Sequence, residues 1–373
     1  MKKIALLVIL LFLLGVGVVA RNQHVAVSPV IPVPTKLFGR EVSTLKVPTG
    51  YAVRTVVENL NTPRDLLVHG GILYVSEMNG GKVDAINLSD FSVHTLLSNL
   101  KRPHGLAIRD GFLYVAQETS VNRYVLDEQN LTAIYDNKVL SLPTGGRHFT
   151  RSLVFDDQGN FYVSVGSTCD VCNEKDDRLA AIMQTSTDGK SVKIFSKGLR
   201  NSVFITKNPK TGAIWGTEMG RDFLGDDIPP DEINIFSEGG NYGWPNCYGD
   251  KVFDTKGASH DSSVCANTIP PVYKIPAHSA PLGLTFDPDG NLLVAYHGSW
   301  NRSVPDGYKI VKLTVKGNSI TGSQDFITGF ISGNAVIGRP VDVEYDSHDN
   351  LFISDDKAGV IYRVTKDVLG TQK

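Results

Sequence analysis

The residues best suited to chemistry crowd into one turn-rich segment, 198–247. Arg200 and Asn201 stand near its beginning. Farther on, carboxylates mix with turn-forming residues between Met219 and Glu232; these are Asp222, Asp226, Asp227, Asp231 and Glu232, with Gly220, Gly225, Pro229 and Pro230. Carboxylates and the carbonyl oxygens of kinked backbone are hard ligands of the kind that Ca²⁺ takes. The composition fits an ordinary solvated acidic loop equally well, because clustered like charges are usually exposed.

A second candidate is His148, in the run Gly145–Arg151. Histidine is the side chain best placed to accept a proton near neutral pH. The sequence does not rank it above His104, His278 and His297, which hold comparable positions. Arginines at strand entries or exits would place cations around one mouth and suit an anionic ligand; they are Arg147, Arg151, Arg200, Arg302 and Arg339. Scattered surface arginines are the alternative.

A repeated unit supplies the scaffold for these residues. An apolar strand, a turn with Gly or Asp, a second strand and a third recur at 64–88, 104–126, 151–167, 202–220, 282–300 and 340–364. A fourth strand precedes the next unit, as at 93–100, 192–199 and 324–330. Four strands per unit at a period of roughly 40 to 60 residues is typical of a propeller.

We therefore predict an all-β fold, a six-bladed β-propeller with four-stranded antiparallel blades. The strand at 51–57 comes before the first unit, so we expect it to be the outer strand of the last blade, closing the ring. The alternative is a coincidence of common strand-turn-strand patterns in another all-β fold.

Two insertions, 169–181 and 221–271, are much longer than a hairpin needs, and long loops of this kind are usually functional. Both follow the second strand of their units, so we expect them on the same face. Four cysteines in an exported chain should be oxidised. Each insertion holds two, so the simplest of three connectivities pairs Cys169 with Cys172 and Cys247 with Cys265. A redox pair or half a zinc site is the alternative for the CxxC motif.

The N-terminal residues of the chain predict export. Residues 1–20 have the basic start, apolar run and small-residue end of a signal peptide, with an uncleaved anchor as the alternative. Residues 21–44 form a Pro-rich linker that we expect to be extended, 45–366 form the propeller, and 367–373 are a C-terminal tail. The predicted location is therefore periplasmic or extracellular. Membrane contact is expected only if residues 1–20 are retained as an anchor.

The charge balance excludes basic-patch functions. Removing Lys2 and Lys3 with residues 1–20 leaves 35 of the 37 basic residues against 39 acidic ones, a net charge of −4. Such a chain has no strong field for nucleic acid or anionic lipid, so no nucleic-acid partner is expected.

Several motifs together resemble the glucose/sorbosone dehydrogenase family, the soluble sugar dehydrogenases that use pyrroloquinoline quinone (PQQ). They are GRHFTRSLVFDDQGNFYVSVGS, GLRN, TEMGRDFLGDDIPPDEIN, GGNYGWP, HGSWNR and GRPVDV. The resemblance covers residues 45–366, and the LGDDIPPDEIN and CYGD motifs are similar to those of the sorbosone dehydrogenase-like branch.

The resemblance implies roles residue by residue. His148 matches the general base, and Arg200 and Asn201 match the pair that contacts the quinone. Gly220 and Arg221 match the residues whose carbonyls hold Ca²⁺, and Arg339 matches a cation that holds the cofactor's carboxylates. The implied reaction is oxidation of an aldose or related sugar aldehyde at C1, with electrons passed to an external acceptor such as a quinone, a cytochrome or a dye.

Three positions depart from the family pattern. Ser167 stands where glucose-oxidising members have an aspartate that orients the base, and Asp170 is a candidate replacement. Asn301 stands near the position where the family has a cofactor-binding lysine, with Arg302 as a candidate substitute, and Val341 stands where the family has the second cation of an Arg-x-Arg pair. These departures argue against glucose as the substrate and lower the expected affinity for PQQ. The rival hypothesis is a non-catalytic propeller that binds a glycan or a protein.

Overall fold

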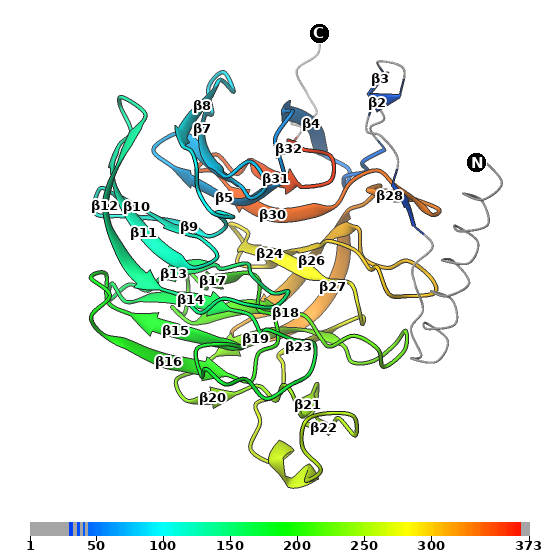
Figure 1. The fold of residues 1–373 in the computed structure, drawn as a ribbon. Coiled ribbons are helices and arrows are strands. Elements are labelled where there is room, and N and C mark those ends of the chain that lie inside the picture. Colours follow the sequence, from blue (N-terminus) through cyan, green and yellow to red (C-terminus); the bar gives the residue numbers. More distant parts are fainter. Residues whose placement is uncertain (1–29, 33–35, 38–39, 42–43, 367–373) are drawn as a thin grey trace, which may run out of the picture.

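Residues 30–32, 36–37, 40–41 and 44–366 are described by the structure, a computed structural model (Figure 1). The predicted signal peptide or anchor at 1–20, most of the linker and the tail at 367–373 lie outside the described residues. The regular elements of the described part are short β-strands and one 3-10 helix, η1 (Ser262–Cys265). In that part of the chain no helix has the length and apolar character needed to span a membrane.

Six sheets of four or five strands make up most of the described residues. The first three contain β5 (Pro63–His69), β6 (Ile72–Glu77), β7 (Lys82–Asn87) and β8 (Val93–Leu97); β9 (Leu106–Arg109), β10 (Phe112–Ala116), β11 (Ser120–Asp127) and β12 (Thr132–Ser141); and β13 (Leu153–Phe155), β14 (Phe161–Val165), β15 (Ala181–Thr185), β16 (Val192–Lys197) and β20 (Gly240–Asn241). The last three contain β17 (Ile205–Lys207), β18 (Ile214–Glu218), β19 (Asp231–Phe236) and β23 (Tyr273–Ile275); β24 (Pro281–Phe286), β25 (Leu292–Tyr296), β26 (Lys309–Lys316) and β27 (Ser319–Ile327); and β30 (Pro340–Tyr345), β31 (Leu351–Asp355), β32 (Val360–Lys366) and β4 (Tyr51–Val57).

The first strands of the six sheets contact one another in chain order, β5, β9, β13, β17, β24 and β30, and β30 returns to β5. The strand β4 pairs antiparallel with β32, with Val53 opposite Val364. The outermost strand of the last sheet therefore comes from the beginning of the described body, as predicted for a closing strand. The all-β propeller architecture expected from the repeats is confirmed.

Turns that contain a hydrogen-bonded aspartate recur at the hairpins between first and second strands. The Asp156 carboxylate accepts the N–H of Asn160 at 2.8 Å, and the Asp287 carboxylate accepts the N–H of Asn291 at 2.7 Å. Gly159 between the first pair has a φ of 87°, a conformation that glycine adopts without strain. These local turns explain why the hairpins could be read from the sequence.

Buried side chains also link one first strand to the next. Asp65 accepts the N–H of Leu106 at 2.6 Å, and Asp342 accepts the N–H of Leu66 at 2.8 Å. Burial raises the pKa of Asp342 to about 7, although the hydrogen bond from Leu66 opposes this shift. A buried acceptor that has a partner avoids the cost of an unsatisfied polar group, so these carboxylates fix the spacing of adjacent sheets.

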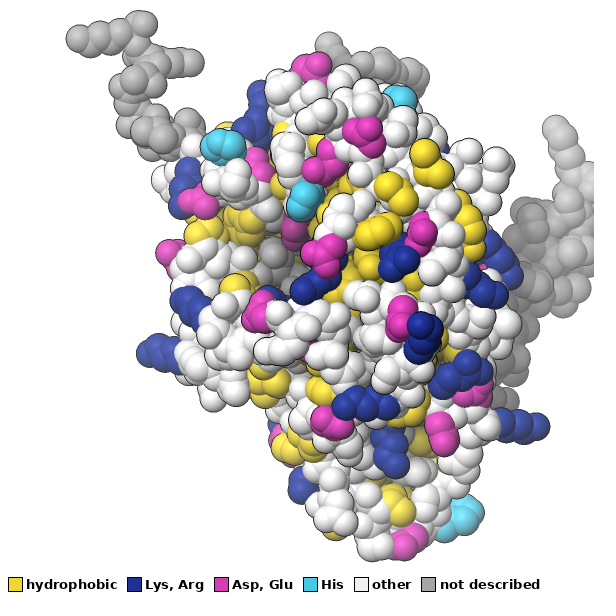
Figure 2. All heavy atoms as spheres, turned by 90° about the vertical axis from the view of Figure 1, so that its left-hand side faces the viewer, with side chains coloured by type: hydrophobic (Ala, Val, Ile, Leu, Met, Phe, Trp, Pro, Cys, Tyr) yellow, Lys and Arg dark blue, Asp and Glu magenta, His cyan; other side chains and the backbone are white. Residues whose placement is uncertain are grey.

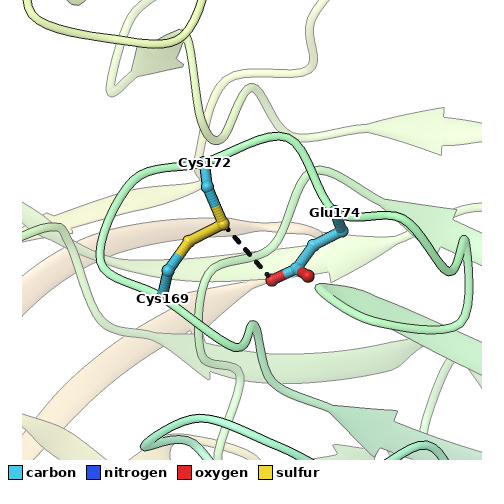
Figure 3. A group of neighbouring side chains, drawn as sticks. All are labelled: Cys169, Cys172 and Glu174. Atoms are coloured by element: carbon cyan, nitrogen blue, oxygen red, sulfur yellow. Dashed lines mark hydrogen bonds between the residues drawn. A yellow bond between two sulfur atoms is a disulfide. The ribbon is translucent and has the colours of Figure 1, made fainter.

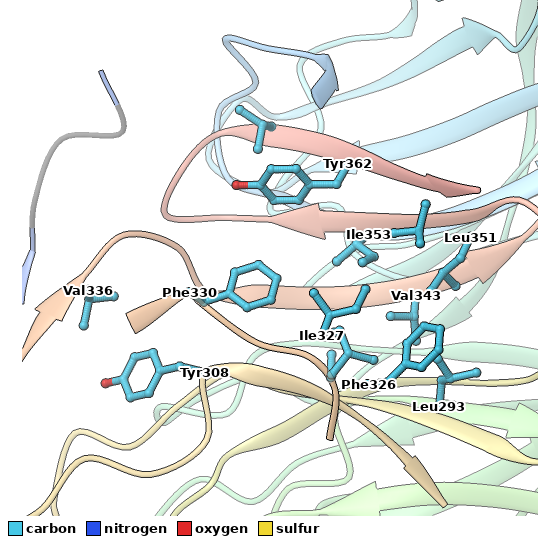
Figure 4. Packing of buried hydrophobic residues seen from close by; sticks show 14 residues of the cluster. Leu293, Tyr308, Phe326, Ile327, Phe330, Val336, Val343, Leu351, Ile353 and Tyr362 are labelled. Atoms are coloured by element: carbon cyan, nitrogen blue, oxygen red, sulfur yellow. The ribbon is translucent and has the colours of Figure 1, made fainter. Parts of the chain in front are cut away.

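The apolar core lies between neighbouring sheets. Figure 4 shows the cluster between the fifth and sixth sheets, where Leu293 and Phe326 meet Val343 and Leu351. Tyr51 of the closing strand packs edge-on against Phe326 at a centroid distance of 5.3 Å. Alternation along each strand directs one set of side chains into these interfaces.

The insertion predicted at 221–271 is not a single loop, which corrects the sequence-based expectation. Residues 231–236 form β19, which pairs with β18 so that Ile233 lies opposite Thr217. Residues 219–230 therefore follow the second strand as expected, whereas 237–272 leave from the opposite end of β19. Within 237–272, β21 (Cys247–Tyr248) pairs with β22 (Val252–Phe253) and β20 extends the third sheet.

Part of the predicted linker pairs with the body. The strand β1 (Ile31–Pro32) is extended, as expected, but it lies parallel to β29 (Ala335–Val336), which pairs with β28 (Ile331–Ser332). The strand β2 (Lys36–Leu37) pairs antiparallel with β3 (Arg40–Glu41).

On the face shown in Figure 2, Lys and Arg side chains are interspersed with Asp and Glu side chains. No broad surface of a single sign dominates that face. This distribution agrees with the near-neutral net charge of −2 for the whole chain.

Candidate active site

A cavity of about 260 Å³ lies beside the segments that lead into several first strands and beside the loops that follow β18 and β25. It is lined by Arg147, His148, Arg200, Asn201, Met219, Gly220, Asp222, Asp231, His278, Ala280, Trp300 and Asn301. Four residues predicted for the site, His148, Arg200, Asn201 and Gly220, are thus brought together from three separate parts of the chain.

His148 has a defined hydrogen-bonding state. Its Nδ1 lies 2.9 Å from the hydroxyl of Ser167, and that hydroxyl donates to the carbonyl of Cys169 at 2.7 Å. Because the Ser167 proton is directed at Cys169, Nδ1 of His148 is the donor and Nε2 is left as the acceptor. Burial, reinforced by the charge of Arg200, lowers the pKa of His148 to about 3. The imidazole is therefore neutral at neutral pH, the state that a general base requires.

Arg200 is almost fully buried and held by two carboxylates. Its Nε donates to Asp170 at 3.0 Å and its Nη2 donates to Asp222 at 3.0 Å. The N–H of Asp222 also donates to Asp170 at 2.9 Å, which joins the loops after β14 and β18. Burial raises the pKa of Asp222, although Arg200 opposes the shift. The guanidinium therefore has a fixed direction and a largely neutralised charge.

Asn301 continues this network on the other side of Asp222. Its amide Nδ2 donates to Asp222 at 2.7 Å and to Nδ1 of His278 at 3.1 Å. Nε2 of His278 donates to the carbonyl of Gly225 at 2.8 Å. Both ring nitrogens of His278 are thus in hydrogen bonds, so it is not a rival base.

The other two histidines that the sequence left unranked are also occupied elsewhere. Nδ1 of His104 donates to the carbonyl of Arg151 at 3.0 Å, and the ring is buried. Nε2 of His297 lies 3.0 Å from Asp356. Neither ring lines the cavity, which leaves His148 as the candidate base.

The backbone at Gly220 is held by a buried carboxylate. Asp231 accepts the N–H of Gly220 at 2.8 Å through one oxygen and the N–H of Ala280 at 2.9 Å through the other. A Cβ at position 220 would lie 2.8 Å from the carbonyl oxygen of Pro230, so this backbone path requires glycine. Burial raises the pKa of Asp231 to about 7.

Arg221 points away from the cavity. Its Nη1 donates to Asp254 at 2.9 Å, which ties the loop after β18 to the Cys247–Cys265 segment. Its side chain lines a smaller neighbouring cavity of about 30 Å³. Among the described residues, neither the carbonyl of Gly220 nor that of Arg221 accepts a hydrogen bond, so both oxygens are available to a ligand.

The structure places Arg302 and Arg339 outside the cavity lining. Arg302 donates to the carbonyls of Asp226 and Ala277 at 2.8 and 2.9 Å, and so holds the acidic loop against the beginning of β24. Arg339 donates to the carbonyl of Gly298 at 2.9 Å and to the hydroxyl of Tyr308 at 3.0 Å. Their roles in binding a cofactor stay predictions.

Trp300 is a cavity residue that the sequence did not single out. It is 46% exposed and packs edge-on against Phe223 at a centroid distance of 6.3 Å. Its exposed ring at the rim of the cavity could stack on the apolar face of a sugar. The only signal in the sequence was its place in the HGSWNR motif.

The predicted disulfides, Cys169–Cys172 and Cys247–Cys265, are both formed. Figure 3 shows Glu174 beside the first of them, with an oxygen 3.9 Å from Sγ of Cys172. These three side chains have the spacing of a metal-binding group. Because the two sulfurs are bonded to each other, they offer no thiolates, and the group is not a zinc site.

The fold and the cavity define an all-β propeller protein with a neutral histidine and a buried arginine at one end of its first strands. A family described as TrAA12-like matches residues 45–367, and the chain belongs to this family. Some relatives are named as PQQ-dependent pyranose or sugar dehydrogenases and another as an aldose sugar dehydrogenase, so the family resemblance predicted from the motifs is confirmed.

Two named relatives illustrate the similarity. The PQQ-dependent pyranose dehydrogenase of Coprinopsis cinerea is 27% identical over 230 residues, covering 47% of this chain and 31% of that protein. The aldose sugar dehydrogenase of Escherichia coli is 30% identical over 162 residues, covering 38% of this chain and 41% of that protein. An uncharacterised protein of Borreliella burgdorferi is 34% identical over 230 residues, 58% and 60% of the two chains. The chain therefore spans less than two thirds of each relative's length.

Solved structures share the fold over nearly their whole length. A family AA12 carbohydrate-active enzyme of Trichoderma reesei has a TM-score of 0.78 at 24% identity, covering 86% of this chain and 97% of that one. The PQQ domain of pyranose dehydrogenase from Coprinopsis cinerea, in its holo form, has a TM-score of 0.75 at 22% identity, covering 90% and 100%.

Proposed function

We propose that this chain is an exported quinoprotein sugar dehydrogenase that binds PQQ and Ca²⁺ in the cavity beside His148. It oxidises an aldose or a related sugar aldehyde at C1 and passes the electrons to an external acceptor. The observation that carries this proposal is the pairing, in one cavity, of a neutral histidine with a free Nε2 and a fixed arginine. The names of the relatives support the same cofactor and substrate class.

The propeller geometry assigned to this function has six blades. The six large sheets and the closed order of contacts among their first strands support that number. The cavity residues then lie at one end of the third, fourth and fifth blades, in loops except for Asp231, which begins β19.

The donor set of the cavity fits an anionic quinone. Arg147, Arg200, Asn201 and Asn301 supply N–H donors, and such donors bind carboxylates and quinone oxygens. Asp222 already engages both Arg200 and Asn301 through its two oxygens. A tricarboxylate cofactor therefore meets donors whose charge is partly cancelled.

A divalent cation removes this difficulty. The free carbonyls of Gly220 and Arg221 are hard oxygen ligands next to the carboxylates of Asp222 and Asp231, which is the donor chemistry that Ca²⁺ prefers. The cation would offset the negative charge of the cavity and leave it attractive to PQQ.

The residues of the chain then have separate tasks. Nε2 of His148 takes the proton of the sugar's C1 hydroxyl, while the C1–H bond gives up its electron pair. PQQ, when bound, supplies the electrophile that accepts that pair. Arg200 offers a fixed positive charge where negative charge grows during the oxidation. An aldose yields a lactone, which water opens to an aldonic acid.

A dye-reduction screen tests this function. Protein reconstituted with PQQ and Ca²⁺ should reduce an artificial acceptor with one or more aldoses or sugar aldehydes, and PQQ alone should not. Absence of turnover with every sugar, combined with binding on a glycan or protein array, would favour a non-catalytic propeller instead.

A further inference from the structure

The loop that follows β14 contacts both reactive groups of the cavity. Its second residue, Ser167, is fully buried and accepts from Nδ1 of His148 at 2.9 Å. The backbone N–H of Ser167 donates to the carbonyl of Arg200 at 2.8 Å. Three residues later, Asp170 binds the guanidinium of Arg200 at 2.9 Å. One loop thus touches the base and the arginine at the same time.

The chain of hydrogen bonds from His148 runs in a single direction. Nδ1–H donates to the Ser167 hydroxyl at 2.9 Å and to the backbone carbonyl of Ser167 at 3.1 Å, and the hydroxyl donates to the carbonyl of Cys169 at 2.7 Å. A carbonyl can only accept, so the serine proton has no second place in this chain. The arrangement therefore selects the tautomer of His148 that leaves Nε2 free, and it does so without a negative charge.

The Cys169–Cys172 disulfide constrains the part of this loop that contacts His148 and Arg200. Cys169 supplies the carbonyl that ends the serine chain. Asp170 lies inside the ring closed by the disulfide, and its own carbonyl accepts from the indole N–H of Trp244 at 2.9 Å. Its carboxylate also accepts the N–H of Asp222.

We propose that residues 167–172 act as one positioning element, in which Ser167 sets the tautomer of His148, Asp170 aims Arg200, and the disulfide keeps the two in register. This inference rests on the proposed function, because it assigns the base and the arginine their roles. Ser167 and Asp170 are positioning residues, since each acts through the group that it holds.

The choice of serine has a consequence for pH. The charged groups around His148 are Arg200, Arg147 and Arg151, all of which oppose a second positive charge. A carboxylate at position 167 would stabilise the imidazolium, whereas the hydroxyl does not. The neutral partner keeps the base unprotonated into the acid range.

The test uses three variants and two readouts. Nitrogen NMR of the histidines in the cofactor-free protein reports the tautomer and pKa of His148, and steady-state kinetics of the reconstituted protein separates kcat from KM. Ser167→Ala should weaken the Nδ1–H tautomer preference, because only the backbone carbonyl of residue 167, 3.1 Å from Nδ1, remains as an acceptor, and it should lower kcat about 10- to 100-fold with little change in KM. Ser167→Asp should raise the pKa of His148 and move the acid limb of the rate profile upward.

The disulfide arm has a matched control. Cys169→Ser with Cys172→Ser should lower kcat about tenfold or more and broaden the His148 signal. Cys247→Ser with Cys265→Ser, which removes the more distant disulfide, should leave kcat within about threefold. Thermal unfolding of each variant identifies any that fails to fold, and Ser167→Asp, which keeps an acceptor, still tests the serine step in that case.

An unchanged His148 tautomer and pKa in both Ser167 variants would overturn the inference, as would equal effects of the two disulfide variants. If the NMR changes occur but no sugar is oxidised, the positioning of His148 stands and the proposed function fails. The two failures are therefore distinguishable.

Discussion

Nη2 of Arg200 lies 3.0 Å from a carboxylate oxygen of Asp222, and the other oxygen of Asp222 accepts from Asn301 at 2.7 Å. Asp222 therefore occupies two of the donors that an anionic cofactor would use. This relationship explains why a cation is needed beside the carbonyls of Gly220 and Arg221 in the proposed function.

Asp222→Asn should make PQQ binding less dependent on Ca²⁺. The variant removes one negative charge from the cavity, so the ratio of Kd without Ca²⁺ to Kd with Ca²⁺ should fall by about tenfold, or about 1.4 kcal/mol. Calorimetric titration measures both constants. Asp226→Asn is the control on the same loop, because its carboxylate faces Ser303 rather than the cavity. An unchanged ratio in Asp222→Asn would show that this carboxylate does not compete with the cofactor.

His148→Ala should abolish turnover while leaving PQQ affinity within about threefold, because the base acts on the sugar. General-base catalysis contributes about 100- to 10,000-fold, which sets the expected loss in kcat. Rapid kinetics and a cofactor titration measure the two effects. His94→Ala, at an exposed position on β8, serves as the control. Loss of PQQ binding in His148→Ala would contradict the assignment.

Trp300→Ala should raise KM about tenfold and change kcat less, because a stacking contact binds substrate and transition state alike. The comparison is Val304→Ala, a nearby side chain that is 69% exposed and does not line the cavity. Steady-state kinetics with the best sugar of the screen measures both parameters. Equal KM values for the two variants would remove Trp300 from the sugar site.

The buried carboxylate of Asp342 should make the fold less stable at high pH. Burial raises its pKa to about 7, so between its unfolded value near 3.8 and that pKa the folded chain retains a proton that the unfolded chain has lost. Its contribution to the free energy of unfolding therefore falls as pH rises through this range and stays low above it.

Asp342→Asn keeps an acceptor for Leu66 and removes the titration. From about pH 5 to about pH 8, the free energy of unfolding of the parent should fall by more than that of the variant, and the difference between the two falls should exceed about 1 kcal/mol. Chemical denaturation at both pH values measures the difference. The exposed Asp349→Asn is the control, and an identical pH dependence of Asp342→Asn and the parent would refute the prediction.

The repeats could be predicted because their signals are local. Alternating strands and turns such as Asp156–Asn160 depend on neighbouring residues, and the structure forms them where the sequence indicated. The strand at 231–236 was missed because it begins with two carboxylates and resembles the acidic loop before it. Its identity depends on pairing with β18 across residues 219–230, which no local pattern shows.

The residues of the candidate site could be predicted from the sequence, but the hydrogen bonds between them could not. The motifs pointed to His148 and Arg200, and the structure brings both to one cavity. The sequence left open whether Asp170 replaces the missing aspartate at position 167. In the structure Asp170 binds Arg200, while Ser167 itself holds His148. Hydrogen bonds between loops distant in sequence decide such roles.

The measurement that tests the account most directly is a calorimetric titration of the cofactor-free protein with PQQ, in Ca²⁺ and in a chelator. The account predicts binding of one PQQ per chain that weakens by about 100-fold or more when Ca²⁺ is removed. Absence of PQQ binding under both conditions, or equal affinity in both, would contradict the claim that this cavity is a calcium-dependent quinone site.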